Sequence, residues 1–217
     1  MSTPAPEPLP APPAVESFSF GGYVGTPGGI EGVGFWQRVG ARIIDLLVHY
    51  FVSLCAGFLF GILLAIAAAM TGQSLPLLLA KQRQHSGIAL FVLALLGSVV
   101  YHTICEGVHG STLGKLIFSM TVMQEDGSPC RLKAALIRDL GYFVDSLFFG
   151  LIGFLSMQGS PQQQRHGDKW AHTIVCKRAL VPPGNLRSNG RFVLGLFLGA
   201  MVDAALILLG LLLKLMG

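Results

Sequence analysis

The sequence predicts an all-α integral membrane protein with three or four membrane helices and a short β-hairpin-like element in its polar loops. Two observations predict this fold class. Only 12% of the 217 residues are charged and the mean hydropathy is +0.63, whereas about 25% of residues are charged in ordinary soluble domains. Four apolar runs also reach the roughly 17–25 residues with which a helix crosses a bilayer. They cover residues 43–70, 88–104, 140–157 and 192–213.

Composition and residue spacing exclude several classes of function. The formal net charge is only +4 and no basic cluster is interleaved with exposed aromatic residues, which argues against nucleic acid as a partner. Four cysteines are scattered without a close pair or a histidine at metal-ligand spacing, so we predict no disulfide frame, no metal site and no cofactor. No nucleophile lies beside a base, and we therefore expect no enzymatic activity. The cysteines are Cys55, Cys105, Cys130 and Cys176.

Residues 1–34 are rich in proline and glycine and contain no lysine or arginine. This composition is typical of a disordered, partly polyproline tail. The tail has neither the basic start nor the hydrophobic stretch of a secretory signal, so membrane insertion is expected to begin with the first helix.

The first apolar run begins with a stripe of polar side chains. Arg38, Arg42, Asp45 and His49 follow one another at spacings of four, three and four, so they share one face of a helix. One interpretation is an interfacial anchor, with Trp36 in the headgroup belt. The other is that Asp45 faces neighbouring helices and handles a cation or a proton. An ionised Asp45 in the bilayer needs a partner, and the nearest cation is Arg42 on the same helix.

A glycine-rich loop follows the second apolar run. Gly110 and Gly114 enclose three residues instead of four, and neither Ser nor Thr follows the lysine, so the loop does not match a Walker phosphate-binding motif. We interpret it as a structural turn that includes Gly110, Thr112, Gly114 and Lys115, with the lysine pointing to the lipid headgroups.

Two short segments, residues 116–123 and 173–176, are predicted to form strands. They bracket residues 130–139, which are predicted to form an amphipathic surface helix or the foot of one, and the third apolar run at 140–157. The strands can pair only if this run re-enters the membrane and returns at its glycines. Charge counting favours the re-entrant form, which places twelve Lys and Arg residues inside and three outside, whereas a full span places seven inside and eight outside. The N terminus is then cytoplasmic.

Two further polar side chains lie within the apolar runs. His102, near the end of the second run, is expected either to lie at the interface or to contact the Asp45 stripe. Asp203 interrupts the last run, where no Lys or Arg is close, so it must find a partner in another helix, be protonated or face water.

Three separated motifs resemble the RDD family of bacterial membrane proteins, which is named for one Arg and two Asp. The motifs are Arg38-x-x-Ala41-x-x-x-Asp45, the loop 110–115 followed by a strand and an Asp126-Gly127 turn, and Gly167-Asp168 leading to residues 173–175. The resemblance implies that Arg38 lies at the foot of the first membrane helix, Asp45 within that helix and Asp168 in the late polar segment.

The resemblance covers about residues 35–180. It divides the chain into a tail at 1–34, an RDD-like membrane domain at 35–180, and a linker with a C-terminal membrane helix at 181–217. One departure is Gly167, where members of the family often have an apolar residue. The last helix lies outside the resemblance, which therefore implies no role for Asp203.

Two functions are consistent with the sequence. The first is transport of monovalent cations or protons, with Asp45, Asp203 and His49 as the candidate groups. Three or four helices can hardly enclose a pathway, so we expect a homo-oligomer or a membrane protein partner within the lipid bilayer. The alternative is a non-transporting membrane scaffold in which Arg38, Asp45 and Asp168 form a structural ion-pair network. Either protein is expected in the bacterial inner membrane, as a multi-pass protein.

Overall fold

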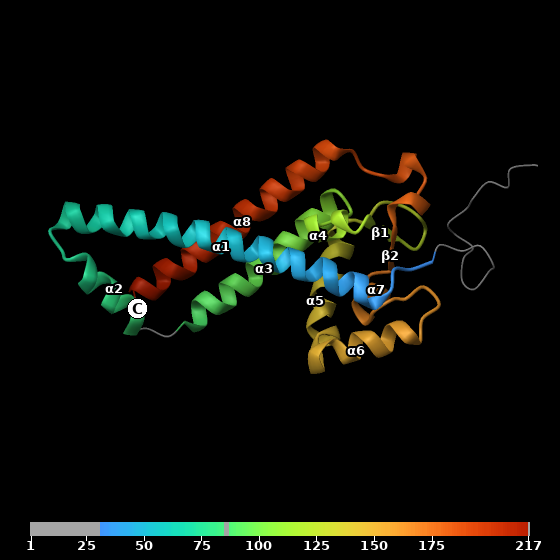
Figure 1. Cartoon of the computed structure of the whole chain (residues 1–217), viewed down its shortest axis with the longest axis horizontal. Coiled ribbons are helices and arrows are strands. Elements are labelled where there is room, and N and C mark those ends of the chain that lie inside the picture. The colour runs from blue at the N-terminus through green and yellow to red at the C-terminus, as the bar shows by residue number, and fades with distance from the viewer. Residues whose placement is uncertain (1–30, 85–86, 217) are drawn as a thin grey trace, which may run out of the picture.

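Three long helices form the body of the molecule. The computed structural model describes residues 31–84 and 87–216, so the prediction of a disordered tail lies outside the described residues up to residue 30. The helices α1 (Phe35–Thr71), α3 (Ile88–Val108) and α8 (Asn189–Met216) run along the long axis of the molecule (Figure 1). The helix α8 packs against both α3 and α1.

The composition of these helices explains why they suit a bilayer. Within the described residues they are the three helices long and apolar enough to cross a membrane, and the mean hydropathy of their most apolar windows is 2.2 to 2.5. Large side chains such as Phe51, Phe58 and Leu95 are exposed on their outer faces, which is favourable in hydrocarbon and unfavourable in water. The helix α1 is roughly 55 Å long, more than a core of about 30 Å requires. Part of α1 therefore extends beyond such a core.

The third apolar run is bent. It belongs to two helices, α5 (Leu132–Asp145) and α6 (Leu147–Gln158), whose axes differ by 114°. The bend contains Phe148, Phe149 and Gly150, which all have positive φ. The turn that the sequence predicts at the glycines is therefore found at Gly150. The predicted surface helix at 130–139 is not separate: it is the first part of α5, and its Arg138 is buried.

A two-stranded antiparallel sheet holds the two ends of this bent segment together. The strands β1 (Met120–Gln124) and β2 (Thr173–Lys177) pair with Thr121 opposite Cys176, which confirms the predicted strand pairing. The first predicted strand begins later than expected because residues Leu113–Ile117 form a short helix, α4. Since the strands pair, the chain enters and leaves α5 and α6 at the same end of the molecule, as the re-entrant prediction requires.

The polar elements gather at one end, which we call the sheet end. It contains α4, both strands, α7 (His166–Trp170) and the 3₁₀ turns η2 (Arg178–Leu180) and η3 (Pro183–Asn185). A small apolar core fixes these elements to α1 and α5, and its members include Ala41, Val122, Ala135 and Val175. The remaining helix, α2 (Leu75–Gln84), lies at the opposite end, beside the C-terminal end of α8 (Figure 1).

Candidate functional site

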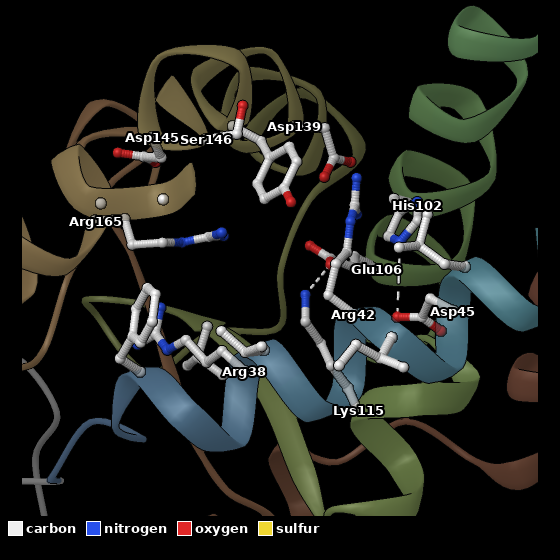
Figure 2. A pocket seen from close by; sticks show the side chains of 18 of the residues that line it. Arg38, Arg42, Asp45, His102, Glu106, Lys115, Asp139, Asp145, Ser146 and Arg165 are labelled. Atoms are coloured by element: carbon white, nitrogen blue, oxygen red, sulfur yellow. Dashed lines mark hydrogen bonds and ion pairs between the residues drawn. The ribbon is translucent and has the colours of Figure 1, made fainter. Parts of the chain in front are cut away.

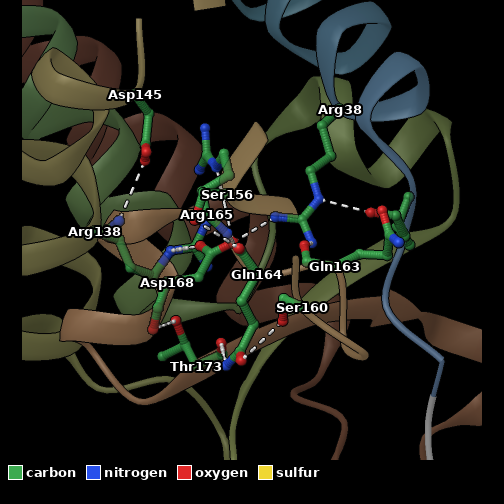
Figure 3. A network of polar contacts seen from close by, with 12 residues as sticks. Arg38, Arg138, Asp145, Ser156, Ser160, Gln163, Gln164, Arg165, Asp168 and Thr173 are labelled. Carbon is green, nitrogen blue, oxygen red and sulfur yellow. Dashed lines mark hydrogen bonds and ion pairs between the residues drawn. The ribbon is translucent and has the colours of Figure 1, made fainter. Parts of the chain in front are cut away.

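An ion pair between α1 and α7 joins residues that are 130 positions apart. The Arg38 guanidinium pairs with the Asp168 carboxylate through Nη1. Its Nε donates to the backbone oxygen of Val33 (2.8 Å) and its Nη2 donates to that of Gln163 (2.7 Å), as Figure 3 shows. Each of the three guanidinium nitrogens therefore has a partner within the protein.

Asp168 is the centre of a buried cluster of arginines at the sheet end (Figure 3). Its side chain is fully buried, and Arg138 Nε lies 3.4 Å from Oδ1 while Arg165 Nε lies 3.7 Å from Oδ2. Burial alone would raise the pKa of Asp168, but the charges of Arg138 and Arg38 outweigh it and hold the pKa well below its usual value. Asp168 is therefore ionised across the physiological pH range.

The glycine before Asp168 is explained by close backbone packing. A Cβ atom on Gly167 would lie 2.6 Å from the backbone oxygen of Arg138, and a Cβ atom on Gly141 would lie 2.4 Å from Gly167 Cα. Only glycine at position 167 lets α7 approach α5 this closely. The glycine at position 167 thus accompanies direct backbone contact between α7 and α5.

A second ion pair extends the network towards α3. Lys115, in α4, pairs with Glu106 near the end of α3, and Arg138 Nη2 lies 3.4 Å from the other oxygen of Glu106. The prediction that Lys115 faces the lipid headgroups is wrong, because its side chain turns inward to this buried carboxylate. Burial lowers the pKa of Lys115, and the charge of Glu106 partly opposes that effect.

Asp45 is held by the glycine-rich loop. Thr112 Oγ1 donates to Asp45 Oδ2 (2.7 Å) and the Gly114 backbone N–H donates to Oδ1 (2.9 Å). A Cβ atom on Gly114 would lie 2.0 Å from the backbone oxygen of Ala41, so the loop touches α1 directly. The pairing of Asp45 with Arg42, which the sequence allows, is not formed.

Two histidines approach the intramembrane carboxylates. His102 Nε2, on α3, lies 3.6 Å from Asp45 Oδ2, so His102 contacts the Asp45 stripe. One turn further along α1, His49 Nδ1 lies 2.7 Å from Oδ2 of Asp203 on α8. Asp203 therefore finds its partner in another helix, which is one of the three possibilities that the sequence leaves.

A cavity of about 350 Å³ opens beside this network, between α1 and the bent α5–α6 segment (Figure 2). Its wall includes Arg42, Asp45, His102, Asp139, Tyr142 and Arg165. Thr103 donates to the Asp139 carboxylate (3.1 Å). Among the described residues, no three His, Cys, Asp or Glu side chains are grouped to hold a metal ion. The cavity thus lies between polar groups of the network and apolar side chains of α1, Ile43 and Leu46.

Fold and site together define a multi-pass helical membrane protein with a buried Arg–Asp network at one end. The RDD family matches residues 33–172, which is more than half of the chain, and the chain belongs to this family. No curated protein and no solved structure matches the chain. Arg38, Asp45 and Asp168 lie inside the matched region, whereas α8 and its Asp203 lie beyond it.

Sequence reasoning missed three members of the network, Glu106, Arg138 and Arg165. Glu106 and Arg138 are charged residues next to apolar runs, and that is the signal that could have marked them. Their partners could not be read from spacing, because each lies on a different element.

Proposed function

We propose that the protein moves protons in exchange for a monovalent cation, with Asp203 and Asp45 as the groups that carry the charge. The observation that carries the proposal is the order of the two His–Asp pairs. Asp45 and His49 are one turn apart on α1, and each reaches a partner on a different helix. The pairs therefore form a series that leads from the cavity at Asp45 and His102 to Asp203 inside the bundle.

The contacts of His102 support proton sharing. Its Nδ1 lies 2.7 Å from the backbone oxygen of Ser98, which can only accept, so Nδ1 carries a hydrogen. The other ring nitrogen, Nε2, then faces the Asp45 carboxylate. Two lone pairs would repel at this position, so a favourable contact requires one proton on either His102 or Asp45. At 3.6 Å the two groups are not hydrogen-bonded, and a small approach would let the imidazole and the carboxylate pass a proton as a relay requires.

Asp203 has the features of a group that exchanges a proton for a cation. It is 1% exposed, and its Oδ2 meets His49 while its Oδ1 has no hydrogen-bond partner among the described residues. An unpaired buried oxygen is unfavourable unless something else binds it at some stage. A proton or a small cation at Oδ1 would meet that need.

The distribution of basic residues supports an orientation. The sheet end carries twelve of the 15 Lys and Arg residues and the α2 end carries three. By the positive-inside rule, the proposal includes a cytoplasmic sheet end and N terminus in a bacterial inner membrane. Lys133→Cys should then react with a charged maleimide only from the cytoplasmic side, and Gln73→Cys only from the outside. The three residues at the α2 end are Lys81, Arg83 and Lys214.

An assembly of several copies is part of the proposal. Beyond Asp203, the buried residues between α1 and α8 are apolar and include Phe60, Leu64 and Ile207. One copy therefore offers no polar route to the α2 end through its described residues. A second copy, or a membrane protein partner, would complete such a route.

A non-transporting scaffold is the second candidate, and one observation favours it. Every guanidinium nitrogen of Arg38 has a partner within the protein, and the Asp168 carboxylate accepts from Arg38 and from the Arg165 backbone N–H, with Arg138 Nε 3.4 Å from its other oxygen. These two family residues therefore have a structural explanation that involves no substrate. In a protein that serves only as a membrane assembly partner, this structural role of Arg38 and Asp168 would be sufficient.

Flux in proteoliposomes tests the proposal. Wild-type protein would be reconstituted and the movement of Na⁺ or K⁺ measured under an imposed pH gradient. We expect Asp203→Asn and Asp45→Asn to abolish flux while both variants insert. Asp126→Asn is the matched control, because Asp126 is exposed in a turn and its side chain accepts from the Ser128 N–H, as asparagine can. Wild-type flux no greater than that of empty liposomes would overturn the proposal and favour the scaffold.

A further inference from the structure

Two arginines meet over one aromatic ring in the wall of the cavity. Arg42, on α1, has its Cζ 4.2 Å from the centroid of the Tyr142 ring, and Arg165, just before α7, has its Cζ 5.6 Å from the same centroid. Figure 2 shows both side chains reaching into the cavity. The ring keeps the two positive charges at a fixed separation, because cations are attracted to an aromatic face.

Both guanidinium groups lack acceptors. Among the described residues, neither Arg42 nor Arg165 donates a side-chain hydrogen bond, and Arg165 Nε is buried without a partner. The closest carboxylate oxygen to Arg165 is that of Asp168 at 3.7 Å, which already pairs with Arg38. A guanidinium has five N–H donors in a planar fork, so these two groups have unused capacity for an anion.

The acidic groups of the same cavity are already engaged. Asp45 accepts from Thr112 and Gly114, and Asp139 accepts from Thr103. Asp145 accepts from the backbone N–H groups of His166 and Gly167. Glu106 accepts from Lys115. The carboxylates thus have donors within the protein, whereas the two arginines over Tyr142 do not. An anion from outside is the group that the cavity lacks.

Part of the cavity lining is apolar. Phe35, Ile43, Leu46 and Phe149 contribute to it, and Phe149 is fully exposed at the bend between α5 and α6. A cavity that combines cations with apolar side chains suits an amphiphile that carries an anionic head. The planar fork of arginine matches the oxygens of a phosphate group, which phospholipid headgroups carry.

We propose that Arg42 and Arg165 together bind a phosphate group, supplied by a phospholipid whose acyl chains lie against Ile43, Leu46 and Phe149. This site shares the cavity with Asp45 and His102 but uses other residues, and it does not rest on transport. It would fix the bent α5–α6 segment to α1 through a lipid, at the level where charged headgroups begin.

The wild-type protein provides the first test. Purified protein in detergent would be incubated with phosphatidylglycerol, with diacylglycerol of the same acyl chains, or with inorganic phosphate, and the bound adducts measured by native mass spectrometry. We expect a one-to-one phosphatidylglycerol adduct and little diacylglycerol adduct. Equal retention of the two lipids would overturn the proposal. An adduct with inorganic phosphate that displaces the lipid would support the phosphate site and reject the lipid as its source.

Variants then locate the site. Arg42→Gln and Arg165→Gln should each lower phosphatidylglycerol affinity about tenfold, as expected for the loss of one charge-assisted contact. Arg42→Lys keeps the charge and should retain more lipid than Arg42→Gln. Lys133→Gln is the control, since Lys133 is exposed on α5 outside the cavity wall. Arginine variants that elute like the wild type and bind the lipid with unchanged affinity would overturn the assignment.

Discussion

Replacing Asp168 with asparagine removes the charge at the centre of the arginine cluster while keeping the shape of the side chain. Arg38 and Arg138 would then remain buried without their shared counter-charge, and Arg138 would keep only Glu106. Removal of one partner from a buried ion pair destabilises a protein by about 3–5 kcal/mol. Because two arginines lose their partner here, we expect a loss of at least about 3 kcal/mol in the free energy of unfolding.

The assay is equilibrium unfolding of the purified protein in mixed micelles of dodecyl maltoside and sodium dodecyl sulfate, followed by circular dichroism. Asp126→Asn is the control, because the exposed turn should change stability by less than about 0.5 kcal/mol. A double-mutant cycle with Arg38→Gln should give a coupling energy of about 0.5–3 kcal/mol. If Asp168→Asn stays within about 0.5 kcal/mol of the wild type, the structural account of the cluster is refuted.

Three further predictions concern close packing and pH. Gly114→Ala places a methyl group 2.0 Å from a backbone oxygen of α1 and should lower stability by about 1–3 kcal/mol, measured in the same unfolding assay. Gly61→Ala, where nothing lies within 4 Å, should be neutral or stabilising by up to about 1 kcal/mol and serves as its control. Gly97→Ala places a methyl group 2.2 Å from Asp203 Oδ1 and should reduce cation flux. Unchanged flux would argue against a role of Asp203 Oδ1 in transport. Since the pKa of Asp168 is lowered by folding, its contribution to stability is present above the unfolded value of about 3.9 and is lost as pH falls through the folded pKa. Acid unfolding should therefore be steeper in the wild type than in Asp168→Asn, and equal slopes would contradict the assignment.

Periodicity and composition were sufficient to predict the long helices and the strand pairing. Apolar runs of bilayer length identify α1, α3 and α8, because the bilayer imposes a minimum length that the sequence displays directly. The two strand-like segments predicted the pairing of β1 with β2, and this pairing required both flanks of the third run to lie at one end. The exact break between α5 and α6 could not be predicted, since it depends on three consecutive residues with positive φ, two of them phenylalanines.

It is harder to predict which residues of the site contact each other than to predict which residues belong to the site. Arg38 and Asp168 could be selected as residues, but their contact spans 130 positions and depends on the close approach of α7 to α5. Lys115 was misjudged because sequence spacing cannot show that Glu106 turns inward beside it. A charged residue near an apolar run has two favourable positions, the headgroups or a buried partner, and only the three-dimensional arrangement distinguishes them.

The geometry separates the charged residues that hold the fold from those that remain free to bind something. Arg38 and Asp168 satisfy each other, so their replacement should reduce stability first and function only as a consequence. Asp203 keeps an unpaired oxygen, and Arg42 has no acceptor among the described residues, so their replacement should change binding or flux with less effect on stability. Measuring stability and flux on the same set of variants therefore distinguishes a transporter from a scaffold. In a scaffold no variant would affect flux, and only changes in the Arg38–Asp168 cluster would have a large effect on stability.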